Sequence, residues 1–224
     1  MSEFNFSPDL SSDEGRVSYG IGRQLGGQLR DNPPPGVDLN AILAGLTDAF
    51  TGQASRVSEA ELGASFKVIR EIMQAEAAAK AEAAAGEGRA YLAENAKREG
   101  VTVLPSGLQY EVVKSAEGRQ PTENDVVTVH YEGSLTDGTV FDSSIKRGSP
   151  IDLPVGGVIP GWVEGLQLMH VGEKFKLYIP SELAYGEQSP SPLIPANSVL
   201  VFDLELLDIK GDEAEQPAEA AEQQ

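Results

Sequence analysis

The side chains that could carry out chemistry in this chain are few, and their types exclude several classes of enzyme. There is no cysteine, which excludes a thiol nucleophile, thiol redox chemistry and a cysteine-ligated zinc site. Neither of the two histidines, His130 and His170, has a second histidine at metal-ligand spacing. Ser143 and Ser144 lack the Gly-x-Ser-x-Gly context of a hydrolase nucleophile, and no phosphate-binding loop or dinucleotide-binding fingerprint is present. We therefore expect a chemistry that uses no metal ion and no cofactor.

One carboxylate stands among aromatic and aliphatic residues in the second half of the chain. Asp142 follows Phe141 after a Thr-Asp-Gly turn, and the other members of the set are Tyr131, Val158, Ile159, Trp162, Tyr185 and Ile194. Aromatic residues on strands usually belong to a core, and a core is the alternative for most of the set. Tyr185 and Ile194 are harder to assign to a core, because their loop is rich in Pro, Gly and Ser. Loops of this kind often carry binding residues.

The elements that must position this set follow from the hydrophobic pattern after Val101. Apolar residues alternate with polar ones around residues 108–112, 127–131, 174–179 and 200–206, which is the period of strands. Residues 161–169 form the only good short helix between them. The pattern predicts an α+β fold in which an antiparallel sheet covers one helix. Residues 211–224 are acidic and contain no apolar cluster, so we expect them to be disordered.

The first half of the chain has the pattern of helices. A first helix begins after Ser11, which has the Ser-x-x-Glu spacing of a capping box, and it carries a stripe of glycines that favours close approach of another helix. A second helix is capped by Asp38 and stopped by Gly52. A third begins at Ser58 with the same Ser-x-x-Glu spacing. Its middle, AEAAAKAEAAA, has high helix propensity but no apolar face, which predicts a solvated spacer.

These patterns divide the chain into four parts. We expect a helical dimerisation domain over residues 1–74, a long helical stalk over 75–100, a second domain over 101–210 and the acidic tail. A helical unit this small buries little surface alone, and oligomerisation is the usual remedy. We therefore predict a homodimer through residues 1–75, in which the stalks hold the two larger domains apart. The alternative is a helical domain that packs on the second half of its own chain.

The charge and the apolar stretches limit the partners. The formal net charge is −18, which argues against nucleic acid and against an anionic membrane surface. The first residues contain no basic region followed by an apolar one, and no apolar stretch approaches the roughly 20 residues of a membrane helix. We expect a cytoplasmic protein.

The candidate residues occur in motifs that resemble those of the FK506-binding-protein (FKBP) family. The co-linear blocks are residues 129–133, VHYEG; 137–144, DGTVFDSS; 158–165, VIPGWVEG; 178–186, YIPSELAYG; and 194–205, IPANSVLVFDLE. Residues 19–22, 45–50 and 92–97 are similar to the dimerisation region of bacterial Mip/FklB-type proteins. The likeness to the FKBP domain covers residues 101–210.

The resemblance implies a peptidyl-prolyl cis-trans isomerase that assists protein folding and binds proline-containing peptides and unfolded proteins. The family's pocket maps onto Tyr131, Phe141, Val158, Ile159, Tyr185, Ile194 and Phe202, with Trp162 as its floor and Asp142 at its side. The Ile159 N–H and the Tyr185 hydroxyl are expected to bind the carbonyls that flank the proline, while Asp142 orients Tyr131. The catalytic residues it implies are Asp142, Tyr185 and Phe141. Macrolide inhibitors such as tacrolimus and rapamycin are expected ligands.

The sequence departs from the FKBP pattern at two places, and two other functions are alternatives to an isomerase. Ile151 and Leu153 stand where many members have aromatic residues, and the Pro-Ser-Pro sequence at 190–192 alters the loop between Tyr185 and Ile194. One alternative function is a non-catalytic chaperone that docks prolines. The other is a purely structural dimer, which leaves the apolar residues of that loop unexplained.

Overall fold

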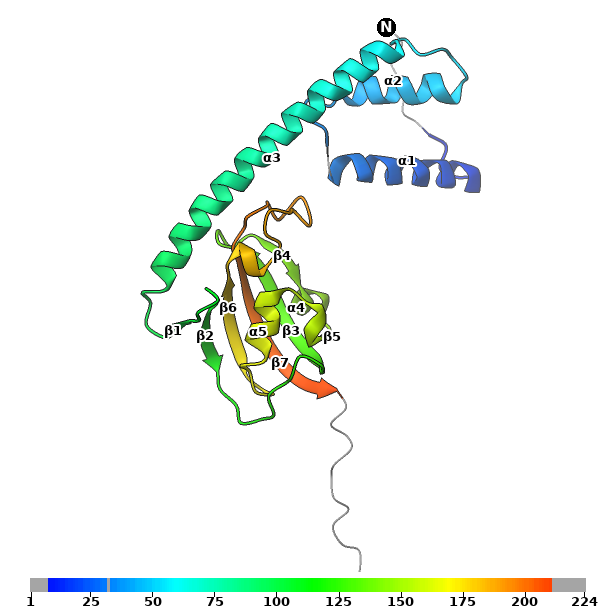
Figure 1. Ribbon diagram of the computed structural model, residues 1–224. Coiled ribbons are helices and arrows are strands. Elements are labelled where there is room, and N and C mark those ends of the chain that lie inside the picture. The colour runs from blue at the N-terminus through cyan, green and yellow to red at the C-terminus, as the bar shows by residue number, and fades with distance from the viewer. Residues whose placement is uncertain (1–7, 32, 211–224) are drawn as a thin grey trace, which may run out of the picture. The chain divides into compact units, whose positions relative to one another are not determined.

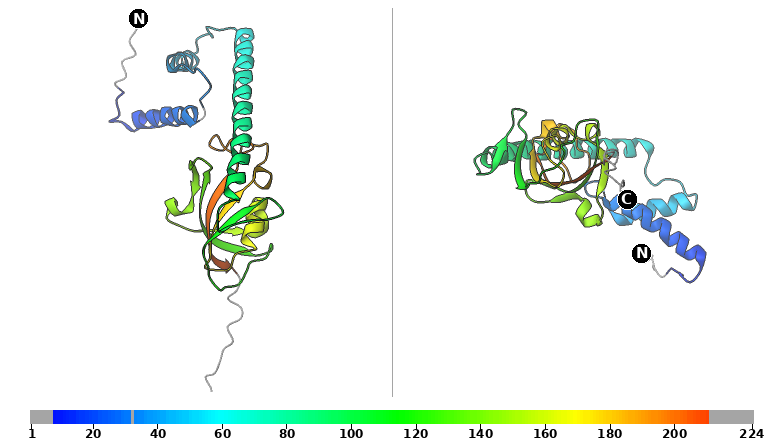
Figure 2. Two further views of the ribbon diagram at one scale, coloured as in Figure 1. Left: turned by 90° about the vertical axis from the view of Figure 1, so that its left-hand side faces the viewer. Right: turned by 90° about the horizontal axis from the view of Figure 1, so that it is seen from below.

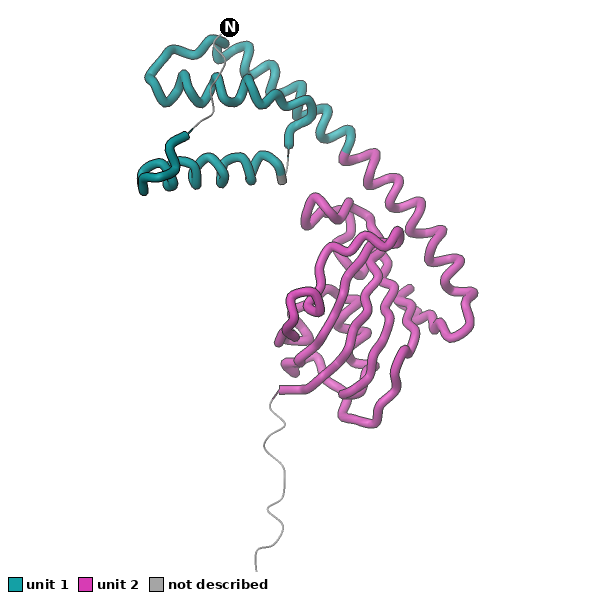
Figure 3. The backbone as a smooth tube through the Cα atoms, turned by 180° about the vertical axis from the view of Figure 1, so that it is seen from behind, with its two compact units in different colours: residues 1–76 teal, residues 77–224 magenta. Residues whose placement is uncertain are grey.

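The computed structural model describes residues 8–31 and 33–210, and the predicted disorder of residues 211–224 lies outside this range. The chain divides into two compact units, residues 1–76 and 77–224, and one helix passes from the first into the second (Figure 3). Within the described residues, no helix is both long and apolar enough to cross a membrane.

Three helices make up the first unit: α1 (Asp13–Asp31), α2 (Leu39–Phe50) and the start of α3 (Glu59–Asn95). Two of the predicted caps are confirmed. The Asp38 carboxylate accepts from the Asn40 N–H at 2.8 Å, and Ser58 and Glu61 form the reciprocal capping box before α3. The predicted cap of α1 is wrong by one residue, because the Ser12 hydroxyl accepts from the Gly15 N–H while Ser11 binds Asp9.

The first unit has no core of its own. None of its described apolar side chains is buried, and Phe50 is 95% exposed. Four exposed apolar side chains of α1 share one stripe of the helix, at Val17, Ile21, Leu25 and Leu29, and Tyr19 is exposed beside it. Burial of apolar surface is the main stabilising term in folding. These helices therefore lack, within their own unit, the contacts that usually stabilise helices of this length.

The second unit is built on a twisted antiparallel sheet, as predicted (Figure 1). Its strands are ordered β1-β2-β6-β7-β3-β4, and β5 pairs with β3 beside that path. The bounds are β1 Val101–Val103, β2 Gln109–Lys114, β3 Val126–Leu135, β4 Val140–Ser143, β5 Ile151–Pro154, β6 Lys174–Ile179 and β7 Leu200–Lys210. The long central pair β3–β7 brings residues from the middle and the end of the domain together.

Short helices complete the second unit: α4 (Ser144–Arg147), α5 (Pro160–Leu166) and the single 3₁₀ turns η1 (Val155–Gly157) and η2 (Ser181–Leu183). Helix α5 packs against β6 through its glycines. A Cβ on Gly161 would lie 2.4 Å from Ile179 Cγ2, and one on Gly165 would lie 2.8 Å from Leu177 Cδ1. The core lies between α5 and this face of the sheet.

The stretch AEAAAKAEAAA in the middle of α3 is largely exposed, but from Gly88 onward the helix packs on the second unit. The predicted stalk over residues 75–100 is therefore wrong in its last part, which is not solvated on all sides. Gly88 and Asn95 are buried, and the Asn95 amide donates to the Gln109 side chain at 2.9 Å. The rings of Tyr91 and Tyr178 lie 6.1 Å apart, and the Arg98 guanidinium donates to the Tyr178 hydroxyl at 2.8 Å.

These contacts place the end of α3 on the face of the sheet opposite α5, since Tyr178 alternates with the core residues Leu177 and Ile179 along β6 (Figure 2). The sequence did not reveal this packing because much of the inner face of α3 before Tyr91 is alanine and glycine. Its neighbours on the exposed faces are also alanine, so no apolar stripe stands out.

Candidate active site

Three adjacent strands and one helix bring the predicted site residues together. Tyr131 lies on β3, Phe141 and Asp142 lie on the neighbouring strand β4, and Phe202 lies on β7 at the other side of β3. Helix α5 supplies Trp162 from the core side of the sheet. Residues that are more than 70 positions apart in the chain thereby line one site.

The aromatic rings meet edge to face. Trp162 lies 5.3 Å from Tyr131 and 5.1 Å from Phe202, with interplanar angles of 80° and 85°. Phe141 meets Phe202 at 5.7 Å and 82°. Such arrangements satisfy the quadrupoles of the rings and hold each ring in one orientation. Phe141 is only half-buried, so part of its surface reaches solvent, whereas Tyr131, Trp162 and Phe202 are buried.

Gly133 allows two of these rings to lie against the strand that carries Tyr131. It is opposite both Asp142 and Phe202 in the sheet, at a register irregularity of the β3–β4 pair. A Cβ at this position would lie 2.6 Å from Phe141 Cε2 and 2.6 Å from Phe202 Cε1. No side chain larger than hydrogen fits there without displacing both rings.

Asp142 forms a three-membered polar group with Tyr131 and Arg147. The Tyr131 hydroxyl and the Arg147 guanidinium both donate to the Asp142 carboxylate. Arg147 also donates to the Tyr131 hydroxyl at 2.9 Å, and its guanidinium lies 5.6 Å from the centroid of the Tyr131 ring. The arrangement supports the orienting role expected for Asp142.

The ionisation of this group follows from the same contacts. Partial burial disfavours the charged carboxylate, but the hydrogen bonds from Tyr131 and Arg147 outweigh it and lower the pKa of Asp142 below its usual range. Burial and the neighbouring carboxylate raise the pKa of the Tyr131 hydroxyl. At neutral pH Asp142 is therefore an acceptor and Tyr131 a donor.

The segment before α5 presents the predicted aliphatic wall. Val158 and Ile159 pack against the core cluster, and Ile159 is the N-cap of α5. Its carbonyl accepts from the N–H groups of Trp162 and Val163 at 2.9 and 3.1 Å, while its own N–H takes no part in these bonds. Pro160 occupies the first helical position, which suits its fixed φ.

The loop between β6 and β7 places Ile194 and Tyr185 differently. Ile194 is buried in the core cluster with Trp162 and Phe202. Tyr185 is 40% exposed and lies outside that cluster. The structure thus joins Tyr131, Phe141, Asp142, Val158, Ile159, Trp162, Ile194 and Phe202 in one site and leaves Tyr185 at the surface.

One buried polar atom at the site has no partner. Trp162 is 5% exposed, and its Nε1–H donates to no acceptor among the described residues. Unsatisfied buried donors are uncommon in proteins and occur preferentially where there is a functional reason.

The departures from the FKBP pattern also have definite places. Ile151 and Leu153 lie on β5, opposite Val129 and Val127 of β3, and both contribute to the core cluster. The prolines of the 190–192 loop stand at an exposed tip beside the bridge between Ser191 and Ile194.

Sequence reasoning missed Arg147 and Gly133 at this site. Arg147 is the only cation that contacts Asp142 among the described residues, and its position five residues after that acid was the available signal. The histidines have structural neighbours: His130 Nδ1 lies 3.0 Å from the Ser144 hydroxyl, and His170 Nδ1 lies 3.2 Å from Glu173. Residues 8–31 and 33–210 contain no cluster of His, Cys, Asp and Glu that could hold a metal.

Comparisons with known proteins match both halves of the chain. A family model described as "FKBP-type peptidyl-prolyl cis-trans isomerase" matches residues 117–207. A second, described as "Domain amino terminal to FKBP-type peptidyl-prolyl isomerase", matches residues 14–112. The second match includes the end of α3 and the first strands of the sheet, which agrees with the packing of α3 on the second unit.

Individual relatives extend over nearly the whole chain. The FKBP-type 22 kDa peptidyl-prolyl cis-trans isomerase of Escherichia coli strain K12 is 47% identical over 203 residues, covering 91% of this chain and 98% of that protein. The outer membrane protein MIP of Legionella longbeachae is 37% identical over 207 residues and covers 90% and 88%. The crystal structure of FkpA from Escherichia coli aligns with a TM-score of 0.63 and 37% identity, over 89% of this chain and 97% of that one.

Proposed function

This chain belongs to the FKBP-type peptidyl-prolyl cis-trans isomerases, and we propose that it isomerises X-Pro bonds in the aromatic cluster around Trp162 without any covalent step. The observation that carries the proposal is the set of edge-to-face rings of Tyr131, Phe141, Trp162 and Phe202, which is half-open at Phe141. A prolyl ring is the apolar group that such a site accommodates.

Rotation about the X-Pro bond can be accelerated by an apolar environment alone. Rotation about an X-Pro bond is slow because resonance gives the C–N bond partial double-bond character. The twisted amide has lost that resonance and separates less charge than the planar form. Moving the amide from water into an apolar site therefore costs less for the twisted form than for the planar form. This difference lowers the rotation barrier, which is catalysis by preferential binding of the transition state.

The polar groups of the site hold the twisted geometry. The Ile159 N–H and the Tyr185 hydroxyl are donors for the carbonyls on either side of the proline. Asp142 and Arg147 hydrogen-bond to the Tyr131 hydroxyl and, together with the neighbouring rings, fix the orientation of Tyr131. Asp142 acts through Tyr131 in this scheme, since a carboxylate that faced the rotating carbonyl oxygen would repel it.

A proline-limited refolding assay tests the proposal, with a short X-Pro peptide as the second substrate. Tyr131→Phe removes the hydroxyl that joins Asp142 and Arg147 but keeps the ring. We expect it to lower kcat/KM about three- to tenfold, which is the effect of losing one hydrogen bond that contributes about 1 kcal/mol. A non-catalytic chaperone would suppress aggregation of the refolding protein without changing the rate for the peptide.

We also propose that the chain is a homodimer through α1, α2 and the start of α3. The support is the apolar surface of the first unit, in which no described side chain is buried. Exposed apolar stripes on α1 and α2 suit a second copy that presents the same stripes, because most oligomers are symmetric and use one self-complementary surface.

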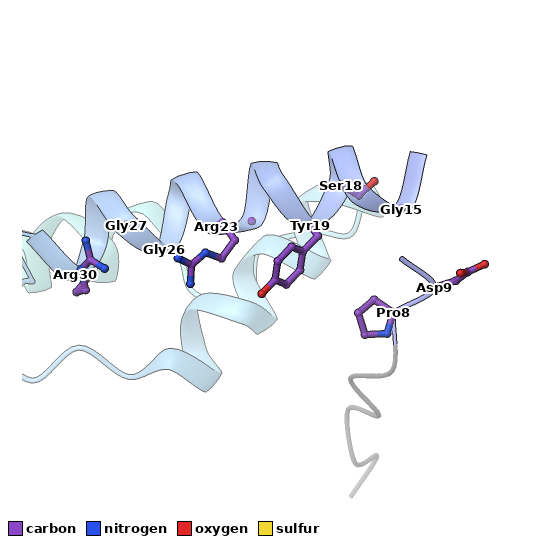
Figure 4. A pocket seen from close by; sticks show the side chains of 10 residues that line it. Pro8, Asp9, Gly15, Ser18, Tyr19, Arg23, Gly26, Gly27 and Arg30 are labelled. Carbon is purple, nitrogen blue, oxygen red and sulfur yellow. The ribbon is translucent and has the colours of Figure 1, made fainter. Parts of the chain in front are cut away.

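The glycine stripe of α1 supports the same partner. A hollow of about 910 Å³ runs along α1 beside Gly15, Gly22 and Gly26, with the side chains of Tyr19 and Arg23 projecting from the helix (Figure 4). A Cβ on Gly22 or Gly26 would meet nothing within 4 Å. Packing inside the unit therefore gives no reason for glycines here, whereas the close approach of a helix from a second copy does.

Three finer statements belong to the proposal. Two linked sites would raise the effective concentration of the second contact with an unfolded client, which is the basis of a chaperone activity. Macrolide inhibitors should compete with the peptide for the aromatic cluster. A cytoplasmic location remains a proposal from the sequence, and fractionation of the source cells tests it.

A further inference from the structure

Helix α3 lies close to Val199, the residue before β7, at Gly88. A Cβ at this position would lie 2.7 Å from Val199 Cγ2 and 3.4 Å from Val199 Cβ. Ordinary contact begins at 3.4 Å, so an alanine would force the Val199 side chain or the helix to move by several tenths of an ångström. Gly86, two residues earlier on the same helix, has open space at its Cβ position.

Val199 contacts α3 at a point between two hollows. A hollow of about 220 Å³ lies between α3 and the Pro180–Glu182 segment, and a second of about 190 Å³ lies between α3 and the 135–137 turn. Val199 lines both hollows. A displacement at Gly88 acts first on Val199, because the three atoms nearest to a Cβ at Gly88 all belong to Val199, its backbone N included.

Val199 ends a short segment that is hydrogen-bonded to the chain neighbours of the two loop residues of the site, Tyr185 and Ile194. The Asn197 N–H donates to the Gly186 carbonyl at 2.7 Å, which fixes the segment to the residue after Tyr185. The Ser198 hydroxyl donates to the Pro195 carbonyl at 2.7 Å, next to Ile194. The backbone of Asn197 has φ +60°, a value that residues other than glycine adopt uncommonly.

The segment is thus held in one bent conformation by its own hydrogen bonds. The Ser189 hydroxyl also donates to the Ile194 carbonyl at 2.7 Å, so the loop tip and the site residue move together. Beyond Val199 the chain enters β7, which carries Phe202. A shift of Val199 is therefore transmitted to Ile194 and Tyr185 rather than absorbed in a free loop.

We propose that Gly88 is a positioning residue for the isomerase reaction: the contact of its backbone with Val199 sets the place of Ile194 and Tyr185 in the substrate site. The inference rests on the proposed function of that site and extends it to α3, which contributes no residue to the aromatic cluster. Gly88 is glycine because only a glycine lets the helix lie at the distance that this placement requires.

The test compares Gly88→Ala with Gly86→Ala in the full chain. Both substitutions raise helix propensity by the same amount, so they differ in the contact with Val199. A misplacement of about 1 Å can cost about 100-fold in rate, and the shift required here is smaller. We expect Gly88→Ala to lower kcat/KM for a short X-Pro peptide about tenfold, mainly through KM, while Gly86→Ala leaves it unchanged.

A size exchange separates positioning from a general loss of stability. Val199→Ala removes the atom that the methyl group introduced by Gly88→Ala would meet, so the double variant Gly88→Ala/Val199→Ala should recover most of the lost kcat/KM. Equal kcat/KM for Gly88→Ala and Gly86→Ala would overturn the proposal, and so would a loss that the second substitution does not relieve. A wild-type chain without isomerase activity would instead contradict the proposed function, whatever the variants do.

Discussion

The packing of α3 on the sheet predicts that the isomerase domain is incomplete when it begins at residue 101. The informative comparison is between fragments 77–210 and 101–210. Both contain every residue of the aromatic cluster, but the shorter one lacks the end of α3 and Arg98. Removal of the end of α3 uncovers Tyr178, which is 1% exposed in the intact chain. It also removes Asn95 and Leu92, the two hydrogen-bonding partners of the Gln109 side-chain amide.

The expected loss of stability follows from these contacts. Burial of a large side chain contributes about 1.5–3 kcal/mol, and the hydrogen bond from Arg98 to the Tyr178 hydroxyl contributes about 1 kcal/mol. The sum of about 2–4 kcal/mol is a large share of the 5–15 kcal/mol typical of a domain. With a urea dependence of about 1–3 kcal/mol per molar, the unfolding midpoint should fall by about 1–4 M.

Urea unfolding followed by the emission of Trp162, the single tryptophan, measures this difference. Tyr178→Phe is the internal control. It should lower the midpoint in fragment 77–210, where the hydroxyl meets Arg98, and have a smaller effect in 101–210. Equal midpoints for the two fragments would refute the reasoning and would mean that α3 lies on the sheet without stabilising it.

Three further outcomes are expected. In a peptide isomerisation assay, Phe141→Ala should lower kcat/KM at least tenfold, and Asp142→Ala should lower it by a smaller factor. Wild-type rates in both variants would show that Phe141 and Asp142 take no part in the mechanism. Light scattering should give about twice the 23.8 kDa of one chain, whereas a Phe50→Asp variant should shift toward the monomer; a wild-type monomer at micromolar concentration would contradict the dimer. Because hydrogen bonds lower the pKa of Asp142, the contribution of this carboxylate to folding stability should be complete above about pH 4 and be lost as the pH falls through that lowered pKa. Peptide isomerisation should show no titration step from Asp142 between about pH 5 and 8. Such a step, present in the wild type and absent in Asp142→Asn, would contradict the assignment.

The sheet and its central helix could be predicted because their signals are local and strong. Alternation along β3 and β7 encodes the buried face directly, and the Pro160-Gly161 start of α5 is a local helix signal. The caps at Asp38 and Ser58 were predictable for the same reason, since a capping side chain binds a backbone group two or three residues away. The aromatic members of the site stood out as blocks within these elements.

The rest could not be predicted because it depends on contacts between distant residues whose types carry little information. Before Tyr91, the face of α3 that packs on the sheet consists of Gly88 and partly buried alanines, and alanine is equally common on its exposed faces. The role of Arg147 depends on α4 turning its side chain back toward Tyr131 on β3. The need for glycine at positions 88 and 133 appears only when Val199, Phe141 and Phe202 are placed beside them.

The most direct test of the central claim joins binding and turnover at Trp162. A short X-Pro peptide is titrated into the full chain while the emission of Trp162 is recorded, and the same peptide is used to measure isomerisation. We predict an emission change that saturates near the KM of the reaction, and the loss of both signals on addition of a macrolide inhibitor. Isomerisation that proceeds with no response of Trp162 would place the reaction elsewhere in the chain and contradict the account.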